Sequence, residues 1–143
     1  MSLQITPFTT SNNELFQQAR EIRDVVFIQE QQVEEQDEFD EFEDGSEHFL
    51  MSLNDKAIGT ARWRVVGDKV KLERFAVLKE FRGKQHGEEL LKAVINSGQN
   101  ENLEMYLHAQ LKAIPFYERQ GFKKVGDLFV ECEIEHYKMV REV

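Results

Sequence analysis

The stretch of residues 72–95 combines a strand, a basic loop with two glycines and a helix. The apolar run Phe75-Ala76-Val77-Leu78 predicts the buried end of a strand. The loop that follows, residues 79–87, carries Lys79, Arg82, Lys84 and His86 with glycines at 83 and 87. Helical spacing then relates Leu90, Leu91, Val94 and Ile95. Because free backbone N–H groups and the helix dipole favour an anion, this order predicts a phosphate-binding loop between strand 69–78 and helix 87–97.

The remaining residues predict a mixed α/β fold. Strands are expected at residues 4–8, 48–53, 57–66, 69–78 and 103–110, and in a final hairpin from residue 122. Ser11 with Glu14 predicts a capping box for a helix that runs to about Gln31, and a short helix is expected over residues 113–120. The central sheet is therefore expected to be mostly antiparallel and flanked by helices.

Length and composition limit the cellular setting. With 143 residues and no linker or repeat, we expect a single domain over residues 1–143. No apolar run approaches the ~18 residues of a membrane helix, and the start lacks signal-peptide features. Cys132 is the one cysteine, so no internal disulfide is possible. We expect a cytoplasmic protein that binds no membrane and, at a net charge of −9, no nucleic acid.

The negative charge is concentrated in one segment. Residues 24–55 contain twelve acids and no Lys or Arg, whereas the rest of the chain has a net charge of +3. Such a segment could place carboxylates around a cationic acceptor beside a body that holds an anionic cofactor. It could equally be a solvated loop that aids solubility. Both interpretations stay open.

Two motifs carry a family resemblance. The loop resembles the acyl-CoA loop of the GNAT N-acetyltransferase superfamily, Gln/Arg-x-x-Gly-x-Gly/Ala, with Arg82 first, Gly87 last and Gln85 in place of the middle glycine. Residues 107–122, LHAQLKAIPFYERQGF, are similar to the family pattern Ala-x-x-Phe-Tyr-x-x-x-Gly-Phe. The succession of VFIQEQ, SEHF, ARWR, LER, HAQ and a late His136 resembles the YjcF-like bacterial branch over about residues 20–139. Residues 132–136, CEIEH, depart from the Ala-Gly-Ile-Pro-His type of that branch.

This resemblance implies a GNAT fold that uses acetyl-CoA as co-substrate. It implies direct transfer, within a ternary complex, to a primary amine of a small molecule or peptide, and homodimers are common among such proteins. The implied cofactor-binding residues are Phe75, Ala76, Val77, Arg82, Gly83, Lys84, Gln85, His86, Gly87, Gln110 and Phe116. Because a side chain at position 85 could obstruct the pyrophosphate, the alternative is a non-catalytic CoA-binding or acidic protein-interaction module with the same fold.

Three residues are candidates for proton transfer. The resemblance implies that Tyr117 protonates the leaving thiolate, which suits a group whose reference pKa exceeds that of a thiol. The alternative is an aromatic packing pair with Phe116. Glu73 is the first candidate for the base, on a face that simple alternation shares with Lys71, Phe75 and Val77. It could instead pair with Arg62 or Arg64.

His108 is the second candidate for the base, on the face of strand 103–110 that also carries Tyr106 and Gln110. A structural hydrogen bond is the alternative for this histidine. The four histidines show no metal-ligand spacing, so no metal is expected. Cys132 is expected to be a partly buried thiol with no acyl-carrier role.

Overall fold

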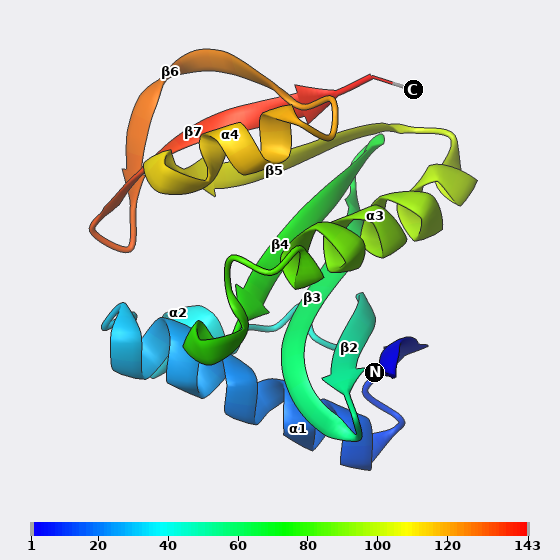
Figure 1. Ribbon diagram of the computed structural model, residues 1–143. Coiled ribbons are helices and arrows are strands. Elements are labelled where there is room, and N and C mark those ends of the chain that lie inside the picture. Colours follow the sequence, from blue (N-terminus) through cyan, green and yellow to red (C-terminus); the bar gives the residue numbers. More distant parts are fainter. Residues whose placement is uncertain (1, 143) are drawn as a thin grey trace.

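A computed structural model describes residues 2–142 and shows a seven-stranded sheet in the order β1-β2-β3-β4-β5-β7-β6 (Figure 1). The strands are β1 (Leu3–Phe8), β2 (Glu47–Leu53), β3 (Lys56–Val66), β4 (Lys69–Val77), β5 (Glu104–Gln110), β6 (Lys123–Glu131) and β7 (Ile134–Arg141). The α-helices are α1 (Asn13–Arg23), α2 (Glu35–Glu38), α3 (His86–Gly98) and α4 (Ile114–Glu118). The predicted mixed α/β fold is confirmed, and every expected strand is present within about two residues of its expected ends.

The sheet is split between β4 and β5. These two strands are parallel, and they pair only where Lys69–Lys71 face residues 104–106, whereas the other neighbours are antiparallel. Beyond Lys71 the two strands diverge toward the N-terminal end of α3 (Figure 1). The backbone edge of β4 that faces the gap therefore lacks a strand partner, which leaves peptide groups free for a ligand.

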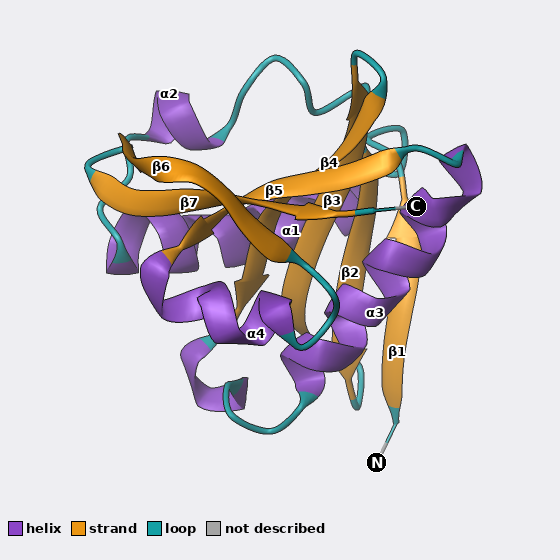
Figure 2. Cartoon of the chain, turned by 90° about the horizontal axis from the view of Figure 1, so that it is seen from above, coloured by secondary structure: helices purple, strands orange, loops and turns teal. Residues whose placement is uncertain are grey.

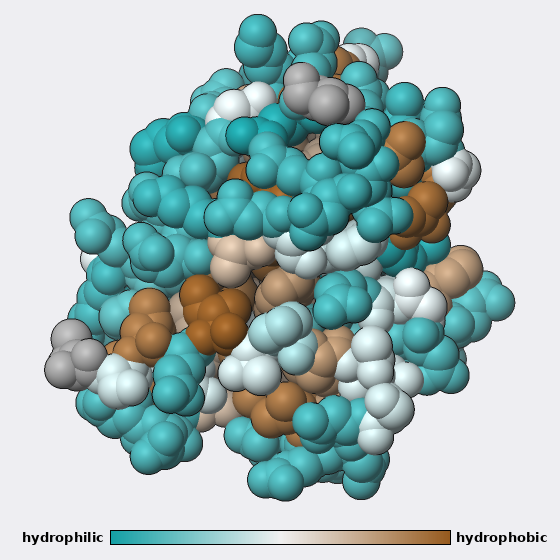
Figure 3. All heavy atoms as spheres, turned by 90° about the vertical axis from the view of Figure 1, so that its right-hand side faces the viewer, coloured by the Kyte–Doolittle hydropathy of each residue, from teal (hydrophilic) through white to brown (hydrophobic). Residues whose placement is uncertain are grey.

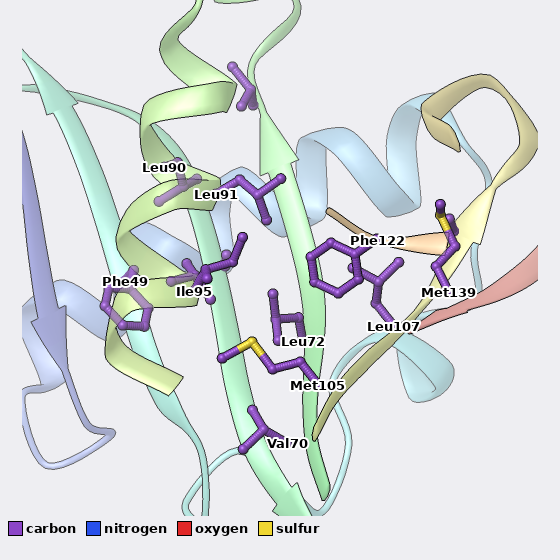
Figure 4. Packing of buried hydrophobic residues seen from close by; sticks show 14 of the residues in the cluster. Phe49, Val70, Leu72, Leu90, Leu91, Ile95, Met105, Leu107, Phe122 and Met139 are labelled. Atoms are coloured by element: carbon purple, nitrogen blue, oxygen red, sulfur yellow. The ribbon is translucent and has the colours of Figure 1, made fainter. Parts of the chain in front are cut away.

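Helices cover both faces of the sheet. Figure 2 shows α3 and α4 on one side and α2 on the opposite side. The larger apolar cluster lies under α3, where Leu90, Leu91 and Ile95 meet Leu72, Met105 and Leu107 (Figure 4). A smaller cluster joins Ala19, Ile22 and Val26 to Leu50 and Ala76. On the face of the molecule seen in Figure 3, hydrophilic side chains cover the upper part.

The first helix differs in detail from the sequence prediction. Asn12, and not Ser11, caps it, because the Asn12 side chain accepts a hydrogen bond from the Leu15 N–H at 3.2 Å. The hydroxyl of Ser11 contacts Thr9 instead, at 2.8 Å. The helix ends as α at Arg23 and continues as the π-helix η1 (Asp24–Glu30), a form often found at functional sites. No helix within residues 2–142 has the length and apolar character needed to cross a bilayer.

A bulge in β4 overturns the predicted side-chain alternation. Opposite Ala61 of β3 lie two residues, Arg74 and Phe75, and Arg74 has a positive φ of 56°. One extra residue reverses the faces, so Phe75 packs against the larger cluster under α3 with Leu72, whereas Ala76 joins the smaller cluster. Glu73 therefore does not share a face with Phe75 and Val77, because the bulge lies between them.

Candidate active site

A cleft of about 1110 Å³ extends from the start of α3 through the split between β4 and β5. The candidate residues that line it are Glu73, Phe75, Ala76, Val77, Arg82, Gly83, Gln85, Gly87, His108, Gln110, Phe116 and Tyr117. Lys84 and His86 are not among its lining residues, and Lys84 is exposed. The split sheet thus brings together most of the residues that the two sequence motifs singled out.

The loop before α3 contains two residues with positive φ. Gln85 is the N-cap residue and lies in the left-handed region, with φ 67° and ψ 0°, although glycine usually takes that conformation. Its side chain makes no capping hydrogen bond, so the first-turn N–H groups of α3 keep their usual freedom. Gly83 also has a positive φ, 77°. This loop fits a pyrophosphate through backbone donors and the helix dipole.

Arg82 is engaged within the protein. Its Nε donates to the Val77 carbonyl at 2.7 Å, and its two terminal nitrogens lie 3.0 Å from the Glu30 carboxylate. Arg82 therefore ties the loop to the end of η1, and it would have to change partners to contact a phosphate. Gln110 makes a similar contact, because its side-chain amide donates a hydrogen bond to the Gln31 side chain at 2.9 Å. Both contacts join the segment after α1 to the walls of the cleft.

Tyr117 lies in an aromatic wall of the cleft. Its ring centroid is 5.1 Å from that of Phe116, 6.1 Å from that of Phe122 and 6.3 Å from that of Phe75. Burial raises the pKa of the Tyr117 hydroxyl above its ordinary value. The hydroxyl is therefore protonated at neutral pH, as a proton donor must be. The same ring contacts also fit the packing interpretation with Phe116.

His108 is oriented by a carboxylate. Its Nδ1 lies 3.2 Å from Oε2 of Glu131, and the hydrogen bond to His108 lowers the pKa of that carboxyl below its ordinary value. Its ring also packs edge-on against Phe129 at 4.9 Å. If Nδ1–H donates to Glu131, the other ring nitrogen, Nε2, is an acceptor. Sequence alternation placed His108 on the correct face with Tyr106 and Gln110, whose partly exposed side chains alternate with the buried ones of β5.

Glu131 was missed by the sequence analysis. It is at the end of β6, in the second strand from β5 within the sheet, and only the closed β6–β7 hairpin brings it to His108. No local motif signals such a pairing, because the two residues are 23 positions apart.

Glu73 is surrounded by cations. Its carboxylate lies 2.6 Å from Nε of Arg64, 2.9 Å from Nη2 of Arg62 and 3.2 Å from Nζ of Lys71. Burial alone would raise its pKa, but the hydrogen bond from Arg64 and the three positive charges outweigh it and lower the pKa to about 2. A carboxylate of this kind is a weak base, which favours the ion-pair interpretation of this residue.

The acidic segment folds back onto buried arginines. Glu38 and Glu43 both contact Arg23 at 2.8 Å, and Asp40 and Glu43 both contact Arg62 at 2.8 Å. Arg23 and Arg62 are almost completely buried, with 1% and 0% of their surface exposed. These carboxylates balance the arginines and anchor the segment to the sheet. The solvated-loop interpretation does not apply to them.

Arg74 joins the bulge of β4 to the same segment. Its Nε donates to the Glu38 carbonyl at 3.1 Å, and its Nη2 donates to the Asp37 carbonyl at 3.1 Å and to Asp40 at 3.0 Å. The positive φ of Arg74 is thus accompanied by three hydrogen bonds that hold its side chain. A strained residue at a cleft is a feature of functional sites.

Cys132 differs from its expected environment. It is exposed in the β6–β7 turn, with a positive φ of 52°, and lines the mouth of the cleft. Partial desolvation of its sulfur and the charge of nearby Asp37 raise its pKa above the ordinary value, so the thiol is less reactive. Among residues 2–142, no group of three His, Cys, Asp or Glu side chains is arranged to hold a metal ion.

The fold and the cleft define a split-sheet α/β protein whose cleft reaches the N-terminus of α3, and comparison with known proteins gives the family. Residues 16–143 match the model of an acetyltransferase (GNAT) domain. The chain is 33% identical over 133 residues to the uncharacterized N-acetyltransferase YjcF of Bacillus subtilis, covering 92% of this chain and 95% of YjcF. It therefore belongs to the GNAT acetyltransferases.

Solved structures agree with this assignment. The crystal structure of Escherichia coli ElaA superposes with a TM-score of 0.86 at 26% identity, over 97% of this chain and 99% of that one. A GNAT family acetyltransferase from Elizabethkingia anophelis with acetyl-CoA bound superposes with a TM-score of 0.71 at 17% identity, over 99% and 98% of the two chains. The second likeness shows the fold alone.

Proposed function

We propose that the protein transfers an acetyl group from acetyl-CoA to a primary amine of a small molecule or peptide. The observation that carries this proposal is the continuous cleft that links the open N-terminus of α3 to Tyr117 and His108. Family membership supports acetyl transfer in general, and the Elizabethkingia relative of the same fold binds acetyl-CoA.

Backbone groups supply most of the proposed cofactor contacts. The N–H groups from Gly83 to Gly87 and the dipole of α3 would hold the pyrophosphate. The edge of β4 at Phe75–Val77, apart from the Val77 carbonyl that Arg82 occupies, would pair with the pantetheine amides, and a main-chain N–H beside the bulge would polarise the acyl carbonyl. Acetyl-CoA supplies an activated thioester at this point.

Two side chains are proposed to transfer protons: one takes a proton from the attacking amine, and the other gives a proton to the leaving sulfur. As the amine nitrogen attacks the carbonyl carbon, His108 Nε2 accepts the proton that the nitrogen loses, and Glu131 stabilises the resulting imidazolium. The C–N bond forms while the C–S bond breaks, and the Tyr117 hydroxyl gives its proton to the departing sulfur. Solvent exchange then returns a proton to Tyr117 and removes one from His108. Glu73 stays an ion-pair partner.

The first test is calorimetric titration with acetyl-CoA and with free CoA, followed by a screen of amines for thiol release. We expect binding in the micromolar range, about −8 kcal/mol. Tyr117→Phe is expected to lower kcat about 100-fold and to leave acetyl-CoA affinity within about twofold. His108→Asn is expected to lower kcat by a similar factor.

Different failures have different meanings. Unchanged turnover in Tyr117→Phe would contradict the proton-donor role. Binding of acetyl-CoA without turnover of any amine would favour the non-catalytic CoA-binding alternative. No binding at all would overturn the proposal, including the phosphate-binding role of the Gln85 loop.

A further inference from the structure

A row of cationic side chains crosses the sheet at the end of the cleft away from the N-terminus of α3. Arg64 of β3 lies directly opposite Lys71 of β4, and Lys71 lies directly opposite Tyr106 of β5. Lys138 of β7 adds a second ammonium, 4.9 Å from the Tyr106 ring centroid, and the ammonium of Lys71 is 5.9 Å from the same centroid. Because like charges directly opposed across a sheet are unfavourable, this arrangement calls for a balancing anion.

The protein balances the row incompletely. Arg64 and Lys71 have Glu73 as their one carboxylate partner, and Arg62 also contacts that carboxylate. In the whole buried network, four carboxylates (Glu38, Asp40, Glu43, Glu73) meet five cations (Arg23, Arg62, Arg64, Lys71, Arg74). Lys138 has no carboxylate within ion-pair distance among residues 2–142. One end of the cleft is therefore positive despite the acidic chain.

The cations have room to receive a ligand. Arg64 and Lys71 line the cleft, with 16% and 15% of their side chains exposed. Nε of Arg64 donates to Glu73, and its guanidinium carbon lies 3.8 Å from the Phe42 ring centroid. No hydrogen bond from its terminal nitrogens is found in the described part of the chain, so the planar fork remains available for a carboxylate.

The pyrophosphate of a cofactor does not explain this positive end. Lys71 and Val77 are six residues apart on β4, which corresponds to roughly 20 Å of strand. The phosphate-binding loop follows Val77, beyond the bulge. On the other wall, Glu131 is hydrogen-bonded to His108, and the charge of Lys71 helps to lower its pKa. A ligand on the acceptor side is left as the source of negative charge.

We propose that the acceptor is an amino acid, in the broad sense of an amine that also carries a carboxylate. Arg64 and Lys71, which line the cleft, would bind the carboxylate, and Lys138, which lies outside the cleft lining beside the Tyr106 ring, would add positive charge. The amine would then point along β4 toward the acyl-binding segment. This proposal rests on the proposed function, and it reverses the preference for a cationic acceptor that the acidic segment alone suggested. The carboxylates of that segment are instead paired with arginines.

A series of amino acids with increasing distance between the amine and the carboxylate tests the proposal through binding, without turnover. The probes are glycine, β-alanine, γ-aminobutyrate and 6-aminohexanoate, each compared with its own carboxamide, and they are titrated into the protein–CoA complex. Chemical shifts of the backbone amides of β5 and β7 report binding. We expect at least one spacing at which the carboxylate form binds on the order of tenfold more tightly than its amide.

Paired variants locate the effect. Lys138→Met and Lys71→Met are each expected to weaken that carboxylate ligand about fivefold to tenfold and to leave its amide unaffected. Glu73 keeps Arg62 and Arg64 in the second variant, so folding should survive. The matched control is Lys124→Met, since Lys124 lies 4.9 Å from the Tyr137 ring centroid on the other face of the same hairpin. Lys124→Met should leave the affinities for the carboxylate ligand and for its amide unchanged.

The results decide between this proposal and the proposed function. If no carboxylate ligand binds better than its amide, or if Lys124→Met weakens binding as much as Lys138→Met, the carboxylate proposal is overturned. In either of those cases, thiol release with amines that lack a carboxylate would show that acetyl transfer still stands. Failure of acetyl-CoA to bind would instead overturn the proposed function.

Discussion

At the residue scale, Gln85 shows why a missing glycine need not disable a phosphate-binding loop. A side chain at φ 67° costs about 1 kcal/mol relative to glycine. Yet the backbone already has the shape that glycine would give, and the side chain is exposed. The substitution therefore affects stability more than it affects the arrangement of the N–H groups of α3.

We predict that Gln85→Gly raises the free energy of unfolding by up to about 1 kcal/mol, because strain is relieved while the unfolded chain gains some entropy. Acetyl-CoA affinity should change less than about threefold. Urea denaturation and calorimetry measure the two effects. Gln85→Ala keeps the strain and removes the amide, so it should be no more stable than the parent. Much tighter cofactor binding in Gln85→Gly alone would contradict this account.

Glu73 and Glu131 offer a matched pair of carboxylates with opposite expected effects. Glu73→Gln should lower the free energy of unfolding by roughly 3 kcal/mol, because it leaves Arg64 and Lys71 without a counter-charge. Its turnover, measured on folded protein, should fall less than about tenfold. Glu131→Gln, at a carboxylate 47% exposed, should alter stability little and lower turnover through His108. A stable Glu73→Gln protein with a 100-fold loss of turnover would identify Glu73 as the base.

The sequence predicts a residue's role in the site when neighbouring residues determine its position, and it fails when a distant segment does. Tyr117 was identifiable because Pro115 in the first turn and Gly121, with φ 91°, define its short helix within a few residues. The contact between His108 and Glu131 was not, because it depends on how β6 and β7 close around β5. Alternation predicts a face and does not predict a partner.

At the element scale, the bulge in β4 separates the two ends of the cleft. Val70 and Leu72 lie at even positions and Phe75 and Val77 at odd ones, with the polar pair Glu73-Arg74 between them, so the sequence does change phase at the bulge, which strict alternation overlooked. Its cause is tertiary, since the acidic segment accepts the hydrogen bonds of the Arg74 side chain. Strand positions were therefore predictable, and the faces beyond Glu73 follow from the apolar phase change, whereas the contacts that hold the bulge depend on the tertiary fold.

Two variants of Arg74 separate backbone strain from side-chain anchoring. Both Arg74→Gly and Arg74→Ala remove the bonds to Glu38, Asp37 and Asp40, so both should lower turnover. Arg74→Ala should in addition be about 1 kcal/mol less stable than Arg74→Gly, because only glycine takes φ 56° without strain. Urea denaturation of the two proteins measures the difference. Equal stabilities would mean that the bulge relaxes once its anchor is gone.

At the scale of the whole molecule, a net charge of −9 conceals a buried network with a surplus of cations. The buried arginines need ionised carboxylates beside them, so the free energy of unfolding should decrease at low pH. Burial alone would raise the pKa of Asp40 and of Glu73, but hydrogen bonds and charge from Arg62 and Arg64 outweigh it and lower both to about 2. Protons therefore bind the unfolded chain more tightly than the folded one at these two residues.

Because the pKa values of Asp40 and Glu73 are lower in the folded protein than in the unfolded chain, the folded protein loses stability as the pH falls. The stabilisation by Asp40 and Glu73 is complete above their ordinary pKa values of 3.8 and 4.5, and it is lost as the pH falls to about 2. Glu43, whose pKa is also lowered, adds to the loss. Glu38 opposes it, because burial raises its pKa despite Arg74 and Arg23.

We predict that the free energy of unfolding falls moderately between about pH 7 and pH 5, because burial lowers the pKa of His48 in the folded protein, and falls steeply below about pH 4.5. Denaturant titrations at several pH values measure this slope. In Glu73→Gln the slope should be smaller, because one of the protonating groups is gone, even though the protein is less stable at neutral pH. If the slope of the free energy of unfolding against pH is unchanged in this variant, the cations around Glu73 do not hold it ionised. The proposed surplus of positive charge at Arg64 and Lys71 would then be contradicted.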